Sequence, residues 1–269
     1  MSIGFIVAGK MAEAMMAGMI AKQVFRPGDI VASDISGGRL AELSRQLGIR
    51  TTPDNAEVVR QARTCVLAVK PQQIDDVLRR LAPDITGEHL LISIAAGKTI
   101  ACLEALLPRG RVIRVMPNIA CLAGEGMNVF TCGGRTTPVD AGEVRSLLGC
   151  CGKALELAEE QFDAVTALSG SGPAFFAWLL DRLVDGAVAA GLPRGQALFL
   201  AEQTMAGTAR LLMDKQMEPA DLAAAVTSPG GTTAAGRAVL VLLCWVKVSN
   251  SLMAACVAAF FSARIFSRS

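Results

Sequence analysis

The chain has 269 residues, of which 52% are hydrophobic and 19% charged, and its formal net charge is +2. This composition is too apolar for a disordered protein and suits one large domain or two modest ones. Basic residues form no stripe and aromatic residues make up only 4%, which argues against a nucleic-acid-binding protein. The eight cysteines include no C-x-x-C pair and the one histidine is His89, which argues against a metal site.

The cysteines and the apolar runs indicate in which cellular compartment the protein is expected. Most cysteines fall in apolar stretches, where we expect reduced core residues and therefore a cytoplasmic protein. The N-terminal apolar run, 3–8, precedes Lys10 instead of following a basic segment, so it is no signal peptide. The apolar tail, 239–266, is interrupted by Lys247 and by polar residues 249–251, whereas a membrane-spanning helix needs about 20 mostly apolar residues. We expect a buried helix pair there and no membrane span.

The first 157 residues alternate short β-rich runs with amphipathic helical patterns. This alternation predicts an α/β fold with a Rossmann-like, doubly wound parallel sheet and helices on both faces. The expected strands are Ile3–Val7, Asp29–Ser33, Thr64–Val69, Leu90–Ile94, Val112–Met116 and Met127–Thr131. The expected helices are Met11–Ala21, Arg39–Leu47, Ala56–Ala62, Ile74–Leu81, Ile100–Leu106 and Val139–Leu148.

After Leu157 only helical patterns follow: Phe175–Ala190, Gly195–Met213, Pro219–Val226 and the residues from Thr232 onward. The change predicts a dinucleotide-binding domain, 1–157, and a second, all-α domain, 158–269. Helices that are apolar on more than one face must be buried, and about 110 residues cannot bury all that surface against themselves. We therefore expect a homodimer formed through the helical domain.

The opening stretch "GFIVAGKMAEA" resembles the G-x-G-x-x-G/A turn of dinucleotide-binding proteins, with Val7, Gly9 and Ala12 at the three positions. Valine tolerates a positive φ poorly, so this turn must be made differently or be strained. The Gly9 amide and the helix at Met11 still offer N–H donors to a phosphate. An ordinary strand–helix turn is the alternative.

Asp34 ends the second expected strand, where an acid hydrogen-bonds the adenine ribose of a bound dinucleotide. An acid repels a 2′-phosphate and favours NADH, whereas Ser33, Ser36 and Arg39 could accommodate NADPH. A helix-capping aspartate explains the residue equally well.

Three further motifs, "AVKPQQI" at 68–74, "SIAAG" at 93–97 and "VMPN" at 115–118, also follow expected strands. They meet at the carboxyl edge of the sheet, where open α/β folds bind ligands, and their small residues leave room for a nicotinamide ribose.

Two later motifs, "DAVTALSGSGPAFF" at 163–176 and "TSPGGTT" at 227–233, place glycines and hydroxyls just before helices. Free backbone N–H groups and hydroxyls in this arrangement bind a small carboxylate, although two capped helix starts are the simpler alternative. The chain has no tyrosine and one histidine, so a side-chain general acid is hard to find. The chemistry is expected to come from a cofactor.

Together these motifs resemble the pyrroline-5-carboxylate reductase family along the chain to about Gly236, above all in "DAVTALSGSGPAF" and "TSPGGTTAAG". The resemblance implies reduction of 1-pyrroline-5-carboxylate by NADPH or NADH, the last step of proline synthesis. It also implies a homodimer, often assembled further into a decamer. Two alternatives stay open: another imine or hydroxyacid reductase of the same two-domain plan, and a catalytically idle dinucleotide-binding dimer.

The resemblance also implies roles for individual residues. Thr166 is expected to hydrogen-bond the ring nitrogen. The substrate set is Glu159, Asn118, Ser228, Gly230, Gly231, Thr232 and Thr233, with the carboxylate on the last five. The dinucleotide set, to which Asp34 is added from the sequence pattern, is Ile6, Val7, Ala8, Gly9, Lys10, Met11, Ser33, Asp34, Asn55, Ala68, Val69, Lys70, Pro71, Ala95, Ala96 and Gly97.

The chain departs from the family pattern at four places. Val7 and Lys10 stand where the family usually has glycine and asparagine, and Ile119–Ala120 replaces Thr-Pro. After Gly236, "RAVLVLLCWVKVSNS" replaces a Leu-Glu pair and a glycine turn, although "LMAACVAAF" resumes the family's final helix.

Overall fold

A computed structural model describes residues 2–238, so the expected tail helices lie outside the described residues. The chain divides into two compact units after Pro173. Residues 158–173, expected at the start of the helical domain, group with the first unit. The domain boundary after Leu157 stays a prediction, and the division after Pro173 describes how the residues pack into compact units.

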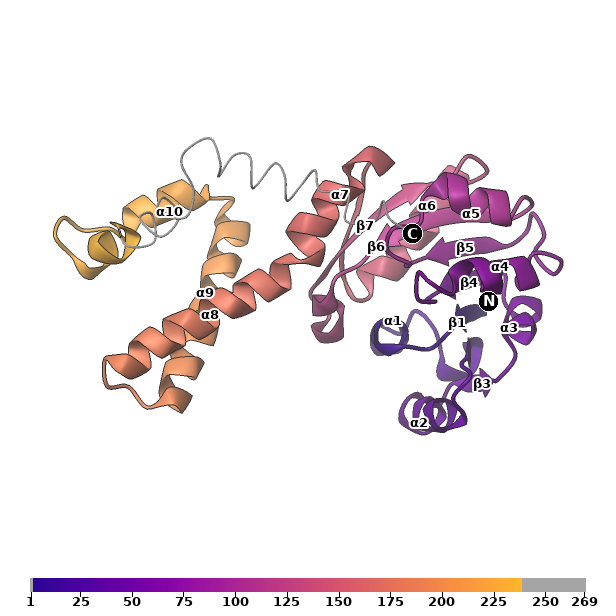
Figure 1. Cartoon of the computed structure of the whole chain (residues 1–269), viewed down its shortest axis with the longest axis horizontal. Coiled ribbons are helices and arrows are strands. Elements are labelled where there is room, and N and C mark those ends of the chain that lie inside the picture. Colours follow the sequence, from indigo (N-terminus) through magenta and orange to yellow (C-terminus); the bar gives the residue numbers. More distant parts are fainter. Residues whose placement is uncertain (1, 239–269) are drawn as a thin grey trace. The chain divides into compact units, whose positions relative to one another are not determined.

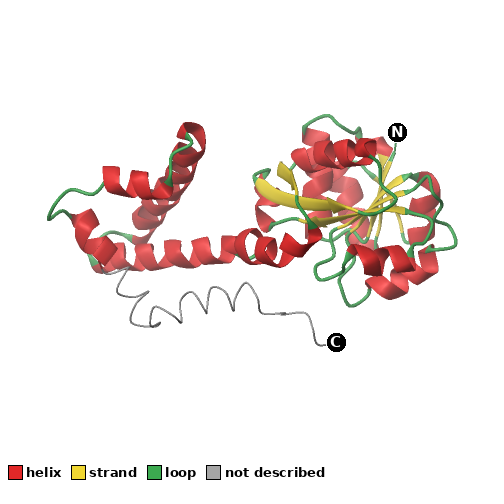
Figure 2. Ribbon diagram, turned by 90° about the horizontal axis from the view of Figure 1, so that it is seen from above, coloured by secondary structure: helices red, strands yellow, loops and turns green. Residues whose placement is uncertain are grey.

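The first unit contains an eight-stranded sheet in the order β3-β2-β1-β4-β5-β6-β7-β8 (Figures 1 and 2). Its first six strands have the 3-2-1-4-5-6 order of dinucleotide-binding folds, and all six run parallel. The strands are β1 Ile3–Ile6, β2 Ile30–Ser33, β3 Arg50–Thr52, β4 Thr64–Leu67, β5 Leu90–Ser93, β6 Arg111–Met116, β7 Gly126–Cys132 and β8 Gly152–Glu156.

The sheet differs from the expected one at its edges. Strand β7 pairs antiparallel with β6, because only the short turn segment 117–125 connects them and no crossover helix intervenes. Strands β3 and β8 were not expected from the sequence. The first is only three residues of polar sequence, and the second carries Lys153 and Glu156, so neither shows the apolar run of a buried strand.

Helices cover both faces of the sheet, as the prediction required (Figure 2). One core joins β-strand side chains to α1, α2 and α6, and the other joins them to α3, α4 and α5. Neighbouring strand residues alternate between the two cores, as Phe5 and Ile6 do, because side chains along a strand point to opposite faces. The helices are α1 Lys10–Ala21, α2 Gly37–Leu47, α3 Asn55–Gln61, α4 Ile74–Leu81, α5 Ile100–Leu106 and α6 Pro138–Gly149.

After β8 the described chain is entirely helical or turn. The short turns Glu159–Gln161, α7 Phe162–Val165 and a π-helical turn, Thr166–Gly170, lead to the long helices. Those helices are α8 Gly172–Ala189, α9 Arg194–Lys215 and α10 Pro219–Ala225, and residues 232–238 are again helical. Within residues 2–238, no helix is long and apolar enough to cross a membrane.

Candidate active site

The turn after β1 has an unusual backbone conformation at the first position of the dinucleotide fingerprint. Val7 adopts φ +67°, a left-handed conformation in which a glycine is normally found. For an L-residue this conformation costs about 1–2 kcal/mol, and a β-branched side chain is among the least tolerant. The structure therefore confirms that the turn is strained at the position where the chain lacks a glycine.

The turn leads into α1, whose first N–H groups are available to a ligand. Gly9 is the N-cap and makes no side-chain capping bond. In residues 2–238, nothing accepts from the amides of Lys10, Met11 or Ala12. A side chain at Gly9 would project into open space, so the backbone there is approachable. Free amides at the positive end of a helix dipole suit a phosphate group.

Asp34 lies beside this turn at the end of β2. Its Oδ2 accepts from the Ala8 amide at 3.2 Å, and its Oδ1 accepts from the Ser36 amide at 2.9 Å. Next to it, the buried Ser33 hydroxyl donates to Asn55 Oδ1 at 2.6 Å, which leaves the Asn55 NH₂ group without a partner in the described chain. Three residues of the predicted dinucleotide set, Ser33, Asp34 and Asn55, thus lie together.

The predicted residues after β1, β4 and β5 differ in burial. Ile6, Ala8, Val69 and Ala95 are buried in the two cores, so only their backbone groups can meet a ligand. Met11, Ala68, Pro71 and Ala96 are half-buried, whereas Gly9, Lys10, Lys70 and Gly97 are exposed or nearly so. An ion pair of 2.7 Å from Lys98 to Asp75 ties the loop after β5 to helix α4.

Asn118 bridges three segments. Its Nδ2 donates to the Ser169 carbonyl at 3.1 Å, and its Oδ1 accepts from the Met127 amide at 3.1 Å. Gly170 lies so close to β6 that an added Cβ would be 2.8 Å from Met116 Cε. The side-chain amide of Asn118, which was expected to contact the substrate, therefore holds the π-helical turn against the sheet.

Arg114 was not identified from the sequence, yet it is the centre of the charged network here. It is a single cation inside the otherwise apolar part of β6, and this was the signal that could have revealed it. Its side chain is 9% exposed, donates to Glu159 Oε1 at 2.8 Å and lies 4.6 Å from the centroid of the Phe162 ring. Glu159 Oε1 also accepts from the Ile100 amide at 2.7 Å.

A cleft of about 290 Å³ opens next to this network. Gly97, Thr99, Arg114, Glu159, Glu160 and Asp163 line it. It brings Gly97 of the predicted dinucleotide set next to Glu159 of the predicted substrate set, although the two are 62 residues apart in sequence.

Within α7 and the π-helical turn, the Thr166 hydroxyl donates to the Phe162 carbonyl at 2.7 Å, and the Ser171 amide donates to the Thr166 carbonyl.

In the second unit, "TSPGGTT" forms a tight turn before a helix. The Gly231 amide donates to the Ser228 carbonyl at 3.1 Å, with Pro229 and Gly230 at the central positions. Gly230 has φ +69°, as the second central residue of a type II turn requires. The Gly231 amide is thus used within the turn, and the amides of Gly230, Thr232 and Thr233 remain without partners in the described chain.

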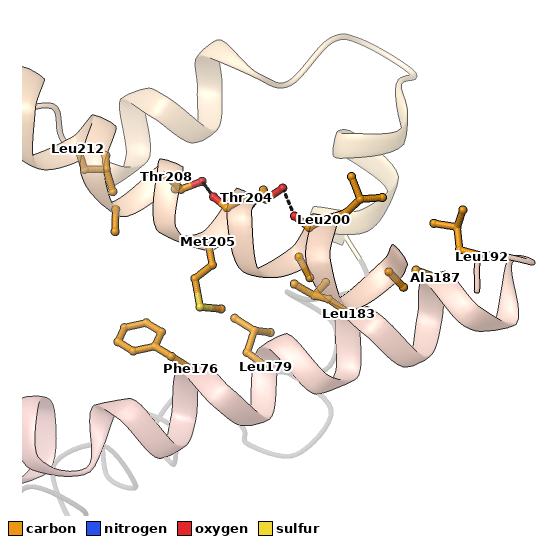
Figure 3. Close-up of a pocket in the computed structure, with 13 residues that line it drawn as sticks. Phe176, Leu179, Leu183, Ala187, Leu192, Leu200, Thr204, Met205, Thr208 and Leu212 are labelled. Atoms are coloured by element: carbon orange, nitrogen blue, oxygen red, sulfur yellow. Dashed lines mark hydrogen bonds between the residues drawn. The ribbon is translucent and has the colours of Figure 1, made fainter. Parts of the chain in front are cut away.

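An apolar groove of about 580 Å³ runs between α8 and α9 (Figure 3). Phe176, Leu179 and Leu183 approach it from α8, and Leu200, Met205 and Leu212 approach it from α9. Thr204 and Thr208 also line it, but their hydroxyls donate to the carbonyls of Leu200 and Thr204. The groove therefore presents almost no unsatisfied polar group.

The cysteines and the histidine serve the framework. Four of the six cysteines in the described chain are buried, as expected, and burial raises the pKa of the Cys65 thiol to about 12. His89 is half-buried, and its Nδ1 accepts from the Thr86 amide while its Nε2 lies 3.2 Å from the Val59 carbonyl. It precedes β5 and is thus at the opposite edge of the sheet from the predicted site.

In comparisons with known proteins, two different family models match the N-terminal and the C-terminal parts of the chain. Residues 2–97 match the family model "NADP oxidoreductase coenzyme F420-dependent", and residues 159–263 match "Pyrroline-5-carboxylate reductase dimerisation". Pyrroline-5-carboxylate reductase of Methanosarcina acetivorans is 45% identical over 235 residues, which are 87% of each protein.

Two solved structures have the same fold. The pyrroline-5-carboxylate reductase of Coxiella burnetii has a TM-score of 0.86 and 31% identity, covering 97% of this chain and 96% of that one. The Plasmodium falciparum pyrroline carboxylate reductase, solved with NADP bound, has a TM-score of 0.85 and 27% identity over the same shares of the two chains. The chain belongs to the pyrroline-5-carboxylate reductase family.

Proposed function

We propose that the chain reduces 1-pyrroline-5-carboxylate to L-proline with NADPH, and that NADH also serves. The family relationship, at 45% identity to a protein of that name, supports the reaction. The observation that carries the assignment to this molecule is the cleft in which the loop after β5 meets Glu159 and Arg114. It lies at the carboxyl edge of the parallel strands, where this fold class binds its ligands.

The residues present fit a dinucleotide. The free amides at the start of α1 suit the pyrophosphate, and Gly9 leaves the approach open. Asp34, Ser33 and Asn55 form the adenosine side, and the segments 68–71 and 95–97 the nicotinamide side. When bound, the dihydronicotinamide supplies a hydride.

The "TSPGGTT" turn is proposed to hold the substrate carboxylate. Its free donors are the amides of Gly230, Thr232 and Thr233, and the hydroxyls of Ser228 and Thr233 stand beside them. The helix that begins at Thr232 adds the positive end of its dipole. The Gly231 amide, which the family resemblance included among the donors, stabilises the turn instead.

Thr166 is proposed to meet the ring nitrogen as a hydrogen-bond acceptor. Its own hydroxyl hydrogen is committed to the Phe162 carbonyl at 2.7 Å, so its free lone pair can only accept. A protonated ring nitrogen donates one N–H, whereas a neutral imine nitrogen would need a donor. The geometry therefore favours binding of the iminium form, which needs no general acid at the moment of hydride transfer.

The protein is also proposed to act as a homodimer, with larger assemblies of dimers possible through the same unit. Phe176, Trp178 and Phe199 are each at least 60% exposed on α8 and α9, and Phe176 lines the apolar groove. Large contiguous apolar surfaces on a single chain are typical of interfaces. The match of residues 159–263 to a dimerisation model supports the same conclusion.

We further propose that the protein resides in a reducing compartment, the cytoplasm, because the cysteines of the described chain are unpaired.

The test is oxidation of NADPH and of NADH, measured separately, by the purified full chain with 1-pyrroline-5-carboxylate. The matched control substrate is 1-pyrroline, which keeps the C=N bond and lacks the carboxylate. We expect L-proline as the product and a much higher KM for the control substrate. A folded protein that oxidises neither dinucleotide with 1-pyrroline-5-carboxylate would contradict the proposal.

A further inference from the structure

We propose that Asp34 and Arg39 form a clamp on the backbone N–H and C=O of Ala8 that keeps Val7 in its left-handed conformation. They are positioning residues, and they replace a glycine that this turn would otherwise require. The inference rests on the proposed dinucleotide site and explains how that site exists in a chain with valine at this position.

The clamp holds Ala8 by both of its backbone groups. Asp34 Oδ2 accepts from the Ala8 amide at 3.2 Å, and Arg39 Nε donates to the Ala8 carbonyl at 2.8 Å. Ala8 directly follows Val7 and is fully buried, so its peptide cannot turn to water for replacement bonds. Relaxing Val7 out of φ +67° would move the backbone N–H and C=O of Ala8 and break one or both bonds.

Arg39 is itself fixed by two carboxylates. Its NH2 donates to Glu13 at 2.7 Å and its NH1 to Glu42 at 2.8 Å, and its side chain is only 14% exposed. The hydrogen bond from Arg39 lowers the pKa of the Glu13 carboxyl. Glu13 lies on α1 and Arg39 and Glu42 lie on α2, so the clamp joins the two helices that flank the turn.

This arrangement moves the cost of the strained turn from ligand binding to folding. With the clamp in place, folding has already forced Val7 into the conformation that presents the helix amides. Without the clamp, Val7 relaxes, and a dinucleotide must then supply the strain energy on binding. A glycine at position 7 carries no such strain, so the clamp becomes dispensable for binding.

The test is a double-mutant cycle of Val7→Gly and Arg39→Met in the full chain, read out by the Kd for NADPH and the Kd for NADH. With valine at position 7, Arg39→Met should weaken both dinucleotides about tenfold, the scale set by one strained left-handed residue. With glycine at position 7, the same change should weaken them by about twofold or less. The KM for 1-pyrroline-5-carboxylate should change little in every variant.

Urea unfolding of the same four proteins gives a second, independent cycle. Val7→Gly should raise the unfolding midpoint more in the wild type than in Arg39→Met, because only the clamped protein holds the strain. Comparing the two backgrounds cancels the flexibility that glycine adds to the unfolded chain. The unfolding midpoints need no ligand, so they test the clamp even if the wild type binds no dinucleotide. A wild type that binds no dinucleotide would refute the proposed function and leave the test of the clamp intact.

Two controls separate the clamp from other roles of Arg39. Glu42→Gln removes one ion pair and leaves the Ala8 contact, so the affinity for both dinucleotides should be unchanged. Arg39→Lys keeps the charge between Glu13 and Glu42 and should fold even if Arg39→Met does not, with a smaller but parallel pattern. Equal losses with valine and with glycine at position 7 would overturn the proposal. A loss confined to NADPH would overturn it too, since Arg39 would then contact the 2′-phosphate directly.

Discussion

Arg114 lies over the ring of Phe162, 4.6 Å from its centroid, and donates to Glu159 at 2.8 Å. This one side chain of β6 thus contacts the first residue of the turn Glu159–Gln161 and the first residue of α7, both of which precede the π-helical turn. The Phe162 carbonyl in turn accepts from the Thr166 hydroxyl. The position of Thr166 relative to the sheet therefore depends on Arg114, although Arg114 does not contact Thr166.

Replacing Arg114 with methionine should lower both the stability and kcat. Charged hydrogen bonds are worth about 1.5–3 kcal/mol, and the 28% exposure of Glu159 places the expected loss at the lower end, about 1–2 kcal/mol. The free energy of unfolding in urea measures this loss. Adding Glu159→Gln should recover part of it, because the half-buried carboxylate that has lost its cationic partner is then replaced by a neutral amide. A double variant less stable than Arg114→Met would contradict this account.

Thr166→Val should lower kcat by roughly three- to tenfold, the effect of about 0.5–1.5 kcal/mol for one hydrogen bond lost at the reacting centre. The valine keeps the shape of the side chain and removes the acceptor. Thr166→Ser is the matched control, since it retains the hydroxyl and should retain most of kcat. Hydride transfer should be measured in single turnovers, so that product release does not mask the step. Wild-type rates for Thr166→Val would show that the motif is merely a helix start.

The sequence was sufficient to predict the core of the sheet, because β1, β2, β4, β5 and β6 are mostly apolar runs, interrupted in β6 by Arg114. It failed at β3 and β8, which are short or polar and exist because a neighbouring strand offers its free edge. The antiparallel direction of β7 was missed for a related reason. Strand direction depends on the connection, and an apolar run is the same in either direction.

For the candidate site too, the sequence predicted part of the arrangement, and the rest depends on contacts between residues distant in sequence. The motifs predicted which loops meet at the carboxyl edge, because parallel strands bring their ends together. They could not show that Asn118 has both amide groups engaged by Ser169 and Met127, or that the Gly231 amide is used inside its own turn. Arg114 was missed because its role depends on Glu159 and Phe162, which are distant in sequence.

Gly231→Ala should raise the KM for 1-pyrroline-5-carboxylate about tenfold, with a smaller effect on the KM for NADPH. An added Cβ would collide with Ser228 Oγ, so the hydroxyl or the turn must move away from the proposed carboxylate position. Gly207→Ala is the matched control, because a Cβ there meets nothing within 4 Å and alanine favours the helix. The prediction fails if both variants give the KM of the wild type.

Leu183→Glu should prevent dimer formation. Leu183 lines the apolar groove of the helical unit and is 53% exposed, so the single chain tolerates a charge there. In an interface the same carboxylate would be buried without a partner, at a cost of several kcal/mol. Light scattering on a size-exclusion column measures the mass. Val139→Glu, at a 78% exposed position on α6, should leave the mass unchanged. Loss of the dimer in both variants would argue against the groove as the interface.

The last prediction concerns the pH dependence of the Glu13–Arg39 pair. The hydrogen bond from Arg39 lowers the pKa of Glu13 below its usual value of 4.5. A carboxylate whose pKa is lower in the folded than in the unfolded protein stabilises the fold above its unfolded pKa, and this contribution disappears as the pH falls through the folded pKa. Wild type should therefore exceed Glu13→Gln in the free energy of unfolding by about 0.5–1 kcal/mol at pH 7.

That difference should hold down to about pH 5 and then shrink progressively below pH 4.5. Other carboxylates titrate in the same range, so the absolute stability of each protein will also fall. Only the difference between the two proteins isolates Glu13, because both share every other acid. A difference that stays constant from pH 7 to about pH 3 would mean that Glu13 acts through packing and not through its charge. Arg39 would then be held mainly by Ala8 and Glu42, and the link from α1 to the clamp would be mechanical, not electrostatic.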